Sequence, residues 1–202
     1  MDENSIAWKT AQRIKEEGGV FTLTNAPIAM RMGKINELAK ACNAEVIPAD
    51  ATSEDELKVL FAKSLEVLGG KLDFVLHSIG MSPNVRKNRP YGDLNYEFFL
   101  KTLDISGLSF HKVLQTAEKT DAMNEWGSIV ALSYIAAQRT YPDYSDMAQA
   151  KSVLESIARS YGYRFAKLKK VRVNTISQSP TKTTAGAGIS GFDSLVDFSE
   201  RM

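Results

Sequence analysis

Short apolar segments alternate with helical patterns along this chain, and that alternation is the feature that most constrains its fold. The segments that predict strands are Val20–Thr24, Glu45–Ala49, Leu72–His77, Ser128–Ser133 and Val171–Ser177. Between them, apolar residues recur at helical spacing over residues 5–17, 30–42, 53–68, 96–118 and 145–165. Strands that alternate with helices pair in parallel, so the pattern predicts an α/β fold with helices packed on the sheet.

Helix end signals support these boundaries. Asn4 or Ser5 caps the first helix, and Gly18 follows its last turn. Ser53 with Glu56 forms a capping box, and the long pattern over residues 96–118 is interrupted near residues 105–107. There is no internal repeat or linker, and 202 residues with 44% hydrophobic content are enough for one core. We therefore expect a single domain over residues 1–202.

Composition excludes several classes of function. The net charge is +1 with both signs interspersed, so we expect no nucleic-acid partner. No apolar run approaches the ~18 residues that span a bilayer, so we expect no membrane segment. The N-terminus lacks a signal peptide, and the single cysteine, Cys42, fits a reducing compartment, so a cytoplasmic location is expected. One cysteine and two histidines provide no metal site.

The strongest chemical signal follows the strand Ser128–Ser133, in a polar loop that leads into the next helical pattern. Tyr144 and Lys151 are seven positions apart, close to two helical turns, which predicts that they share one face of a helix. A nearby ammonium lowers the pKa of a phenol, so the pair can form a proton-donating couple. A surface tyrosine with a solvated lysine is the alternative on spacing alone.

The surroundings of this pair resemble the enoyl-acyl-carrier-protein reductases, a family within the short-chain dehydrogenase/reductase superfamily. The resemblance is carried by the residues Tyr134, Pro142–Tyr144, Met147, Lys151, His77–Gly80 and the pair Pro180 and Thr183, in matching order and separation. It covers essentially the whole chain. Ordinary members of the superfamily have three residues between Tyr and Lys, whereas this family has six. We expect the three additional residues to add about 4.5 Å of helical rise, moving the acid away from the hydride donor.

The resemblance implies a fold and a reaction. The fold is a Rossmann-like doubly wound parallel sheet with helices on both faces. The reaction is reduction of the C2=C3 double bond of trans-2-enoyl thioesters with NADH in fatty-acid elongation, and NADPH is not excluded. The catalytic residues are Tyr144, Lys151 and Tyr134. Another short-chain reductase, acting on a ketone or alcohol, is the alternative within the enzyme class.

The same resemblance assigns binding residues and partners. It implies cofactor contacts from Ser5, Ile6, Asp50, Ala51, Ser78, Ile79, Gly80, Lys151, Pro180, Thr181 and Thr183, and substrate contacts from Ser82, Tyr134, Tyr144 and Met147. It also implies acyl carrier protein as partner, a homotetramer, and a substrate lid over residues 184–202. A plain flexible loop is the alternative for the lid, and a solvated charged loop is the alternative to a carrier contact for residues 84–90.

Two further residues have structural alternatives. Asp50 is expected to cap the turn that follows its strand, a role that is compatible with cofactor binding. His77 is expected to be packed at a strand end instead of acting in catalysis.

The resembled family has elements that this chain is expected to lack. The family opens with a strand and a glycine-rich pyrophosphate loop, and ends with a further helix and strand. The absent first strand is expected between Val20–Thr24 and Leu72–His77. An inactive fragment that lacks the glycine-rich cofactor loop is therefore a further alternative.

Overall fold

A computed structural model describes residues 2–31, 34–140, 144–178, 180–181, 183 and 196–197. The strands are β1 (Thr22–Leu23), β2 (Glu45–Val46), β3 (Leu72–His77), β4 (Met123–Tyr134) and β5 (Arg172–Gln178). The α-helices are α1 (Ile6–Glu16), α2 (Ile35–Cys42), α3 (Glu54–Leu68), α4 (Pro83–Arg86), α5 (Tyr96–Leu103), α6 (Ser109–Lys119) and α7 (Met147–Lys169). Short 3₁₀ turns span Ala29–Arg31, Tyr91–Asp93 and Ile135–Ala137. Most of the predicted lid, residues 184–202, lies outside the described residues.

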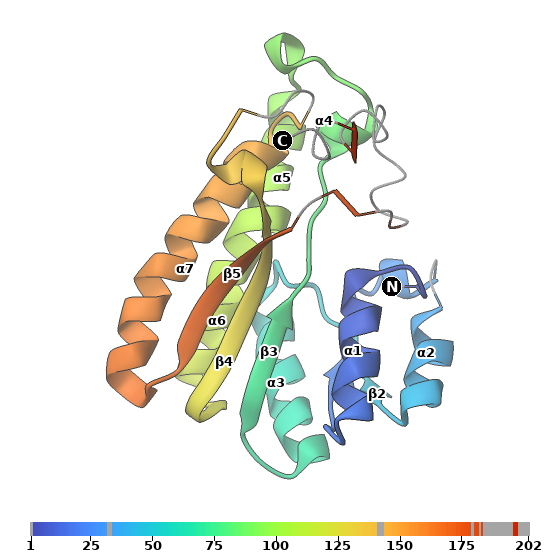
Figure 1. Cartoon of the computed structure of the whole chain (residues 1–202), viewed down its shortest axis with the longest axis vertical. Coiled ribbons are helices and arrows are strands. Elements are labelled where there is room, and N and C mark those ends of the chain that lie inside the picture. The colour runs from blue at the N-terminus through green and yellow to red at the C-terminus, as the bar shows by residue number, and fades with distance from the viewer. Residues whose placement is uncertain are drawn as a thin grey trace.

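The strands pair in parallel, as predicted, but form two sheets in the described part of the chain (Figure 1). One sheet is β1–β2, and the other is β3–β4–β5, with Ile129 of β4 paired to Val75 of β3 and Val173 of β5. The break between β1 and β3 is the position at which a further strand is expected from the sequence. The parallel order places the carboxyl ends of β3, β4 and β5 at one edge.

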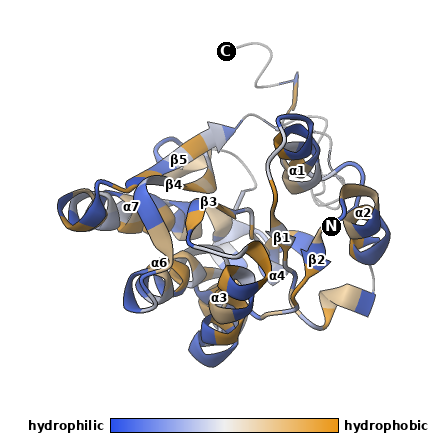
Figure 2. Ribbon diagram, turned by 90° about the horizontal axis from the view of Figure 1, so that it is seen from below, coloured by the Kyte–Doolittle hydropathy of each residue, from blue (hydrophilic) through white to orange (hydrophobic). Residues whose placement is uncertain are grey.

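Helices lie on both sides of the sheets, which confirms the predicted α/β architecture. Seen from below, α3, α6 and α7 cover one side, while α1 and α2 lie on the other (Figure 2). The main core lies under α3, α6 and α7 and includes Phe110, Leu114, Ile129 and Leu154. A smaller core around Trp8 joins α1 and α2 to β1.

The predicted interruption of the long helix is real and has a packing cause. A π-helical segment, Asp104–Leu108, separates α5 from α6. A Cβ atom on Gly107 would lie 3.0 Å from the Ala150 carbonyl oxygen of α7, so glycine permits a close approach of the two helices. Ser106 at the same place accepts a hydrogen bond from the Met81 amide at 2.8 Å and donates one to the Met81 carbonyl at 3.0 Å. The irregular turn therefore holds the loop that follows β3.

Membrane spans and metal clusters are both absent from the described part of the chain. No described helix is long and apolar enough to cross a membrane. The described histidine, cysteine and carboxylate side chains form no group that could hold a metal ion.

Candidate active site

The candidate site lies at the edge where β3, β4 and β5 end. The chain leaves β3 through Ser78–Gly80, while β4 ends at Tyr134, which pairs with Gln178 at the end of β5. The first turns of α7 lie at the same end of the molecule (Figure 1). Ligands of open α/β sheets bind outside the carboxyl ends of the strands, so this edge is the expected place for a cofactor.

Lys151 is the buried cation of the site. Its side chain extends from α7, and its Nζ atom donates to the Leu132 carbonyl at 2.7 Å and the Ile79 carbonyl at 3.5 Å. Lys151 is only 6% exposed, and this burial lowers the pKa of its ammonium to about 8. An ammonium has three N–H donors, so these bonds leave one for a ligand beside Gly80.

Gly80 is open toward this ammonium. A Cβ atom built on Gly80 would lie 3.8 Å from both the Lys151 Nζ and the Met147 Cε atoms, and the residue is exposed. The backbone at Gly80 can therefore be approached closely by a polar group that also accepts from Lys151. A ribose hydroxyl has this chemistry, so the residues fit the predicted cofactor.

Tyr144 is brought to the same edge, but its geometry differs from the prediction. The helix α7 begins at Met147, and Ser145 has a left-handed backbone with φ of 50°. Tyr144 therefore lies in the loop before the helix and does not share a helical face with Lys151. The expected gain of helical rise between the two residues was wrong for this reason.

The surroundings of Tyr144 are aromatic and apolar. Its ring centroid lies 4.6 Å from that of Tyr134, with 42° between the ring planes. It also packs against Met147 and Val85. Burial raises the pKa of Tyr144 to about 12, so the predicted lowering by Lys151 does not occur in this structure. Tyr144 is held as a neutral phenol, the form that can donate a hydrogen bond or a proton.

Ser82, which was predicted to contact the substrate, is held by two hydrogen bonds within the protein. It is 3% exposed, and its hydroxyl donates to the Asp146 carboxylate at 2.6 Å. Its oxygen also accepts from the Val85 amide at 3.0 Å, which caps α4. The single proton of the Ser82 hydroxyl is thus engaged with Asp146, so donation to a substrate would require breaking that bond, while one lone pair is left to accept. The buried residue Asp146 was not among the residues predicted from the sequence.

His77, just before Ser78, is packed as predicted. It is 2% exposed, its ring lies 5.1 Å from that of Phe110, and its Nε2 atom is 2.8 Å from the Ser109 Oγ atom. The Ser109 hydroxyl donates to the Ile105 carbonyl at 2.6 Å, so the proton between His77 and Ser109 belongs to Nε2. Burial first, and then the charge of Lys151, lowers the pKa of His77 to about 3, so the ring is neutral.

The remaining predicted cofactor residues lie at ends of elements. Ser5 caps α1 by accepting from the Trp8 amide at 3.2 Å, and Ile6 is the first residue of that helix. Asp50 caps its turn as predicted, since its Oδ1 atom accepts from the Thr52 amide at 2.9 Å. Ala51 packs against the main core.

The capping box at α3 is only half formed. Ser53 accepts from the Glu56 amide at 3.3 Å, but the Glu56 carboxylate bonds to the Asp50 amide at 2.8 Å instead of returning to Ser53. The turn before α3 is therefore fixed from both sides.

Directly after β5, Pro180 and Thr183 are half-buried and Thr181 is exposed. Residues 141–143, the Tyr-Pro-Asp part of the motif, lie outside the described residues. The structure thus gathers Ser78–Gly80, Tyr134, Tyr144, Met147 and Lys151 at one edge, and their contacts with a cofactor stay predictions.

A parallel α/β sheet with a tyrosine and a buried lysine at its carboxyl edge is the arrangement of the short-chain dehydrogenase/reductase class. A family model described as enoyl-(acyl carrier protein) reductase matches residues 1–202. The chain therefore belongs to the enoyl-acyl-carrier-protein reductase family.

Individual relatives agree with this assignment. The NADH enoyl-acyl-carrier-protein reductase 1 of Rhizobium meliloti (strain 1021) is 33% identical over 200 residues, covering 98% of this chain and 72% of that enzyme. The FabI enzyme of Aquifex aeolicus (strain VF5) is 33% identical over 203 residues, covering 100% and 73%. The crystal structure of a FabI–NADH complex from Alistipes finegoldii has 60% identity and a TM-score of 0.97, covering 100% of this chain and 71% of that one.

Proposed function

We propose that this chain is an NADH-dependent enoyl-acyl-carrier-protein reductase that reduces the C2=C3 double bond of trans-2-enoyl thioesters in fatty-acid elongation. The observation that carries the proposal is the meeting of Tyr144, Lys151 and the open backbone of Gly80 at one sheet edge. The names of the relatives, which are NADH enoyl reductases, support the choice of reaction.

The bound nicotinamide would supply the hydride that is delivered to C3 of the enoyl thioester. As the hydride arrives, negative charge develops on the thioester oxygen. The neutral Tyr144 phenol donates a hydrogen bond to this oxygen and then gives it a proton. The resulting enol gains a proton at C2 and loses the one on oxygen to give the saturated thioester, and the Tyr144 phenolate regains its proton from solvent. Tyr134, whose ring packs against that of Tyr144, flanks the acyl chain, and Met147 lines the same apolar wall.

Lys151 binds and orients the cofactor. Two of its N–H donors are held by the carbonyls of Leu132 and Ile79, which fixes the third toward the ribose. We also propose the predicted cofactor contacts of Ser5, Ile6, Asp50, Ala51, Ser78, Pro180, Thr181 and Thr183. Burial raises the pKa of Tyr144 in the free protein, which keeps the phenol protonated.

The reaction class is tested by comparing two thioesters of equal length. A trans-2-enoyl thioester should consume NADH, and the matching 3-ketoacyl thioester should not. Preference for the ketone would replace this proposal by an ordinary short-chain ketone reductase. Measuring the enoyl reaction with NADPH in parallel tests the cofactor preference.

The roles of the two residues are tested by substitution. Tyr144→Phe should lower kcat by about 10²-fold or more, the scale expected for loss of a general acid, with little effect on NADH affinity. Lys151→Ala should weaken NADH binding, which calorimetric titration reports. Normal turnover by Tyr144→Phe would remove Tyr144 from the chemistry.

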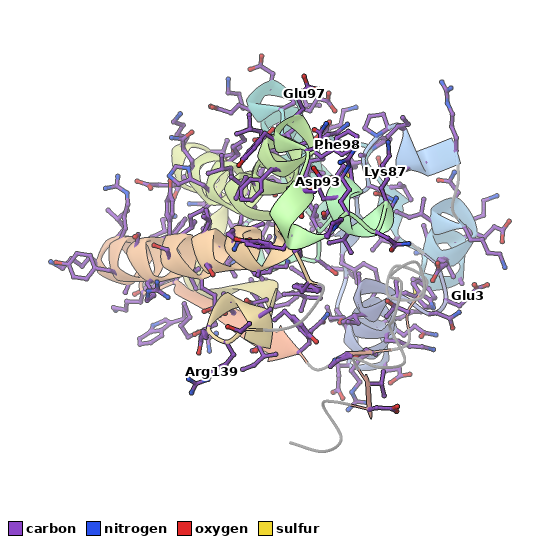
Figure 3. All side chains as sticks on the ribbon, turned by 90° about the horizontal axis from the view of Figure 1, so that it is seen from above. Glu3, Lys87, Asp93, Glu97, Phe98 and Arg139 are labelled. Carbon is purple, nitrogen blue, oxygen red and sulfur yellow. The ribbon has the colours of Figure 1, made fainter. Side chains whose placement is uncertain are left out.

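Acyl carrier protein is proposed as the carrier of the substrate, with the basic loop at residues 86–89 as its contact. Lys87 lies over the Phe98 ring, 4.5 Å from its centroid, on the face that Figure 3 shows. In the same loop, Arg89 pairs with Asp93. Arg86 ends α4 and is exposed. Such cations steer an acidic partner, mainly through the association rate.

The carrier contact has a matched test. Arg86→Glu should raise KM for the enoyl-carrier substrate several-fold and leave KM for a short enoyl thioester without carrier unchanged. Lys63→Glu, an equal change at an exposed position on α3, serves as the control. An equal effect of both reversals on the carrier substrate would refute the assignment of this loop.

A homotetramer is proposed as the assembly. Large apolar side chains on α5 and α7 are exposed in the single chain, among them Leu100 and Tyr163, each 67% exposed. Exposed apolar side chains of this size favour burial against another subunit. Light scattering of the purified protein tests the stoichiometry, and a monomer at working concentration would refute it.

A further inference from the structure

A buried carboxylate lies two residues after Tyr144 and has no role in the proposed chemistry. Asp146 is fully buried at the start of α7. Its Oδ1 atom accepts from the Ser82 hydroxyl at 2.6 Å, and its Oδ2 atom accepts from the Asn84 amide at 2.8 Å and the Thr102 hydroxyl at 2.9 Å. The Asp146 side chain makes no cap to α7, so these carboxylate bonds lead away from its own helix.

The donors are themselves fixed to different elements. Ser82 caps α4, and Thr102 is a fully buried residue of α5. The Asn84 side chain exchanges two bonds with the Asn95 backbone, accepting from its amide at 3.1 Å and donating to its carbonyl at 3.1 Å. Asn95 in turn caps α5. The carboxylate of Asp146 therefore ties the start of α7 to α4 and α5 at a single buried point.

The residue between Tyr144 and Asp146 shows that this attachment constrains the chain. Ser145 has a φ of 50°, a left-handed conformation that L residues other than asparagine and aspartate adopt reluctantly. Such a conformation persists where the surrounding structure fixes it. On one side it is fixed by the buried carboxylate, and on the other by the packing of the Tyr144 ring on Tyr134 and Met147.

The same network reaches the other wall of the site. Ser82 follows Gly80 and Met81, and Met81 is held by the two hydrogen bonds with Ser106. The loop after β3 and the loop that carries Tyr144 are thus joined through Asp146. The shorter bond of Lys151, to the Leu132 carbonyl at 2.7 Å, leads to β4 and not to this joint, whereas its longer contact, to the Ile79 carbonyl at 3.5 Å, lies in the loop after β3.

We propose that Asp146 is a positioning residue for Tyr144: its buried carboxylate, by binding Ser82, Asn84 and Thr102, sets where the Tyr144 hydroxyl lies over the substrate. The inference rests on the proposed function, in which Tyr144 is the acid. It separates the main support of the acid from that of the cofactor, since Asp146 fixes the phenol while the shortest bond of the Lys151 ammonium is to Leu132 in β4.

A double-mutant cycle between Asp146→Asn and Tyr144→Phe tests this. Asparagine keeps the size of the side chain but offers one acceptor oxygen in place of two, so at least one of the three donors loses its partner. Asp146→Asn should lower kcat by about 10- to 100-fold, the cost of a small misplacement of a reacting group, and change the Kd of NADH by less than about twofold. In the Tyr144→Phe background, the same substitution should lower the residual rate by less than about twofold.

The outcomes separate the possible roles. A merely structural role for Asp146 would lower kcat by the same factor in both backgrounds, and that result would overturn the inference. If Tyr144→Phe alone keeps normal turnover, the proposed acid is wrong and the inference falls with it. If Tyr144→Phe is slow and Asp146→Asn is not, only the positioning role is refuted.

A milder pair of variants covers the case in which Asp146→Asn does not fold. Thr102→Val removes one donor to Asp146, and Thr116→Val removes an equivalent hydroxyl that donates at 2.8 Å to the Lys112 carbonyl on α6. Thr102→Val should lower kcat several-fold in the wild-type background and hardly at all in the Tyr144→Phe background, while Thr116→Val should leave kcat unchanged. Equal kcat values for the two valine variants would contradict the proposal.

Discussion

Acid should destabilise this protein through the buried residue His77. His77 is 2% exposed, and its neutral ring donates to Ser109 through Nε2. Burial and the charge of Lys151 lower its pKa to about 3. The perturbation is therefore a fall in pH from about 7 to about 5, across which an ordinary histidine with a pKa of about 6.5 gains a proton and His77 does not.

The sign and size follow from proton linkage. Because the folded-state pKa of His77 lies below the unfolded value, the free energy of unfolding is unaffected above about pH 6.5. The free energy of unfolding then decreases progressively as the pH falls toward 3, since His77 binds a proton only in the unfolded chain. Each pH unit in this window costs about 1.4 kcal/mol, so a fall to about pH 5 should cost about 2 kcal/mol.

Urea unfolding at about pH 7 and about pH 5 measures this loss. His77→Gln keeps an N–H donor for Ser109 and cannot titrate. Between the two pH values, its free energy of unfolding should therefore fall by about 2 kcal/mol less than that of the wild type. The chain has two histidines, and His111→Gln is the control, because His111 is exposed. Equal pH dependence of His77→Gln and wild type would refute the reasoning.

Three further substitutions or conditions have definite expectations. The affinity for NADH should fall on the order of tenfold between about pH 7.5 and about pH 9, because the buried Lys151 ammonium loses its proton near pH 8; calorimetry of Lys151→Met should show no such fall. Gly107→Ala should destabilise the fold by about 1–3 kcal/mol, since its Cβ would lie 3.0 Å from the Ala150 carbonyl oxygen. Gly92→Ala, which meets nothing within 4 Å, is the control in the same thermal unfolding assay. Ser145→Gly should relieve the left-handed strain and raise the unfolding free energy by up to about 1 kcal/mol; a loss would mean that the Ser145 side chain stabilises the turn.

Local patterns were sufficient for most of the fold. The strand Leu72–His77 was predicted with the same bounds, because this short, mostly apolar segment lies between glycine-bearing turns and has no competing helical pattern. The break between α5 and α6 was visible in the residues around Gly107. The strand β4 was predicted too short: it begins at Met123, and its first residues, including Asn124 and Glu125, are too polar to be read as a buried strand.

The site was predictable only in part. Tyr134, Tyr144 and Lys151 were found from the motif, and the structure gathers them. The left-handed turn at Ser145 has no sequence signal, since serine is not a preferred residue there. Asp146 was missed because its donors come from positions 44, 62 and 64 residues away, which no spacing rule connects. A carboxylate at the start of a helical pattern is ordinarily an exposed cap.

Because of the turn at Ser145, the long spacing between Tyr144 and Lys151 does not correspond to two turns of a single helix. If both residues lay on one helix, their separation would be set by helix pitch, and any change in α7 would move them together. In this structure α7 begins at Met147, so Tyr144 is held by Asp146 and by the Tyr134 ring, while Lys151 is held by the carbonyls after β3 and in β4. The shortest bond of Lys151, to Leu132 in β4, is thus separate from the supports of Tyr144. The position of the acid relative to the cofactor can therefore change through the loop alone, without disturbing the helix that carries the lysine.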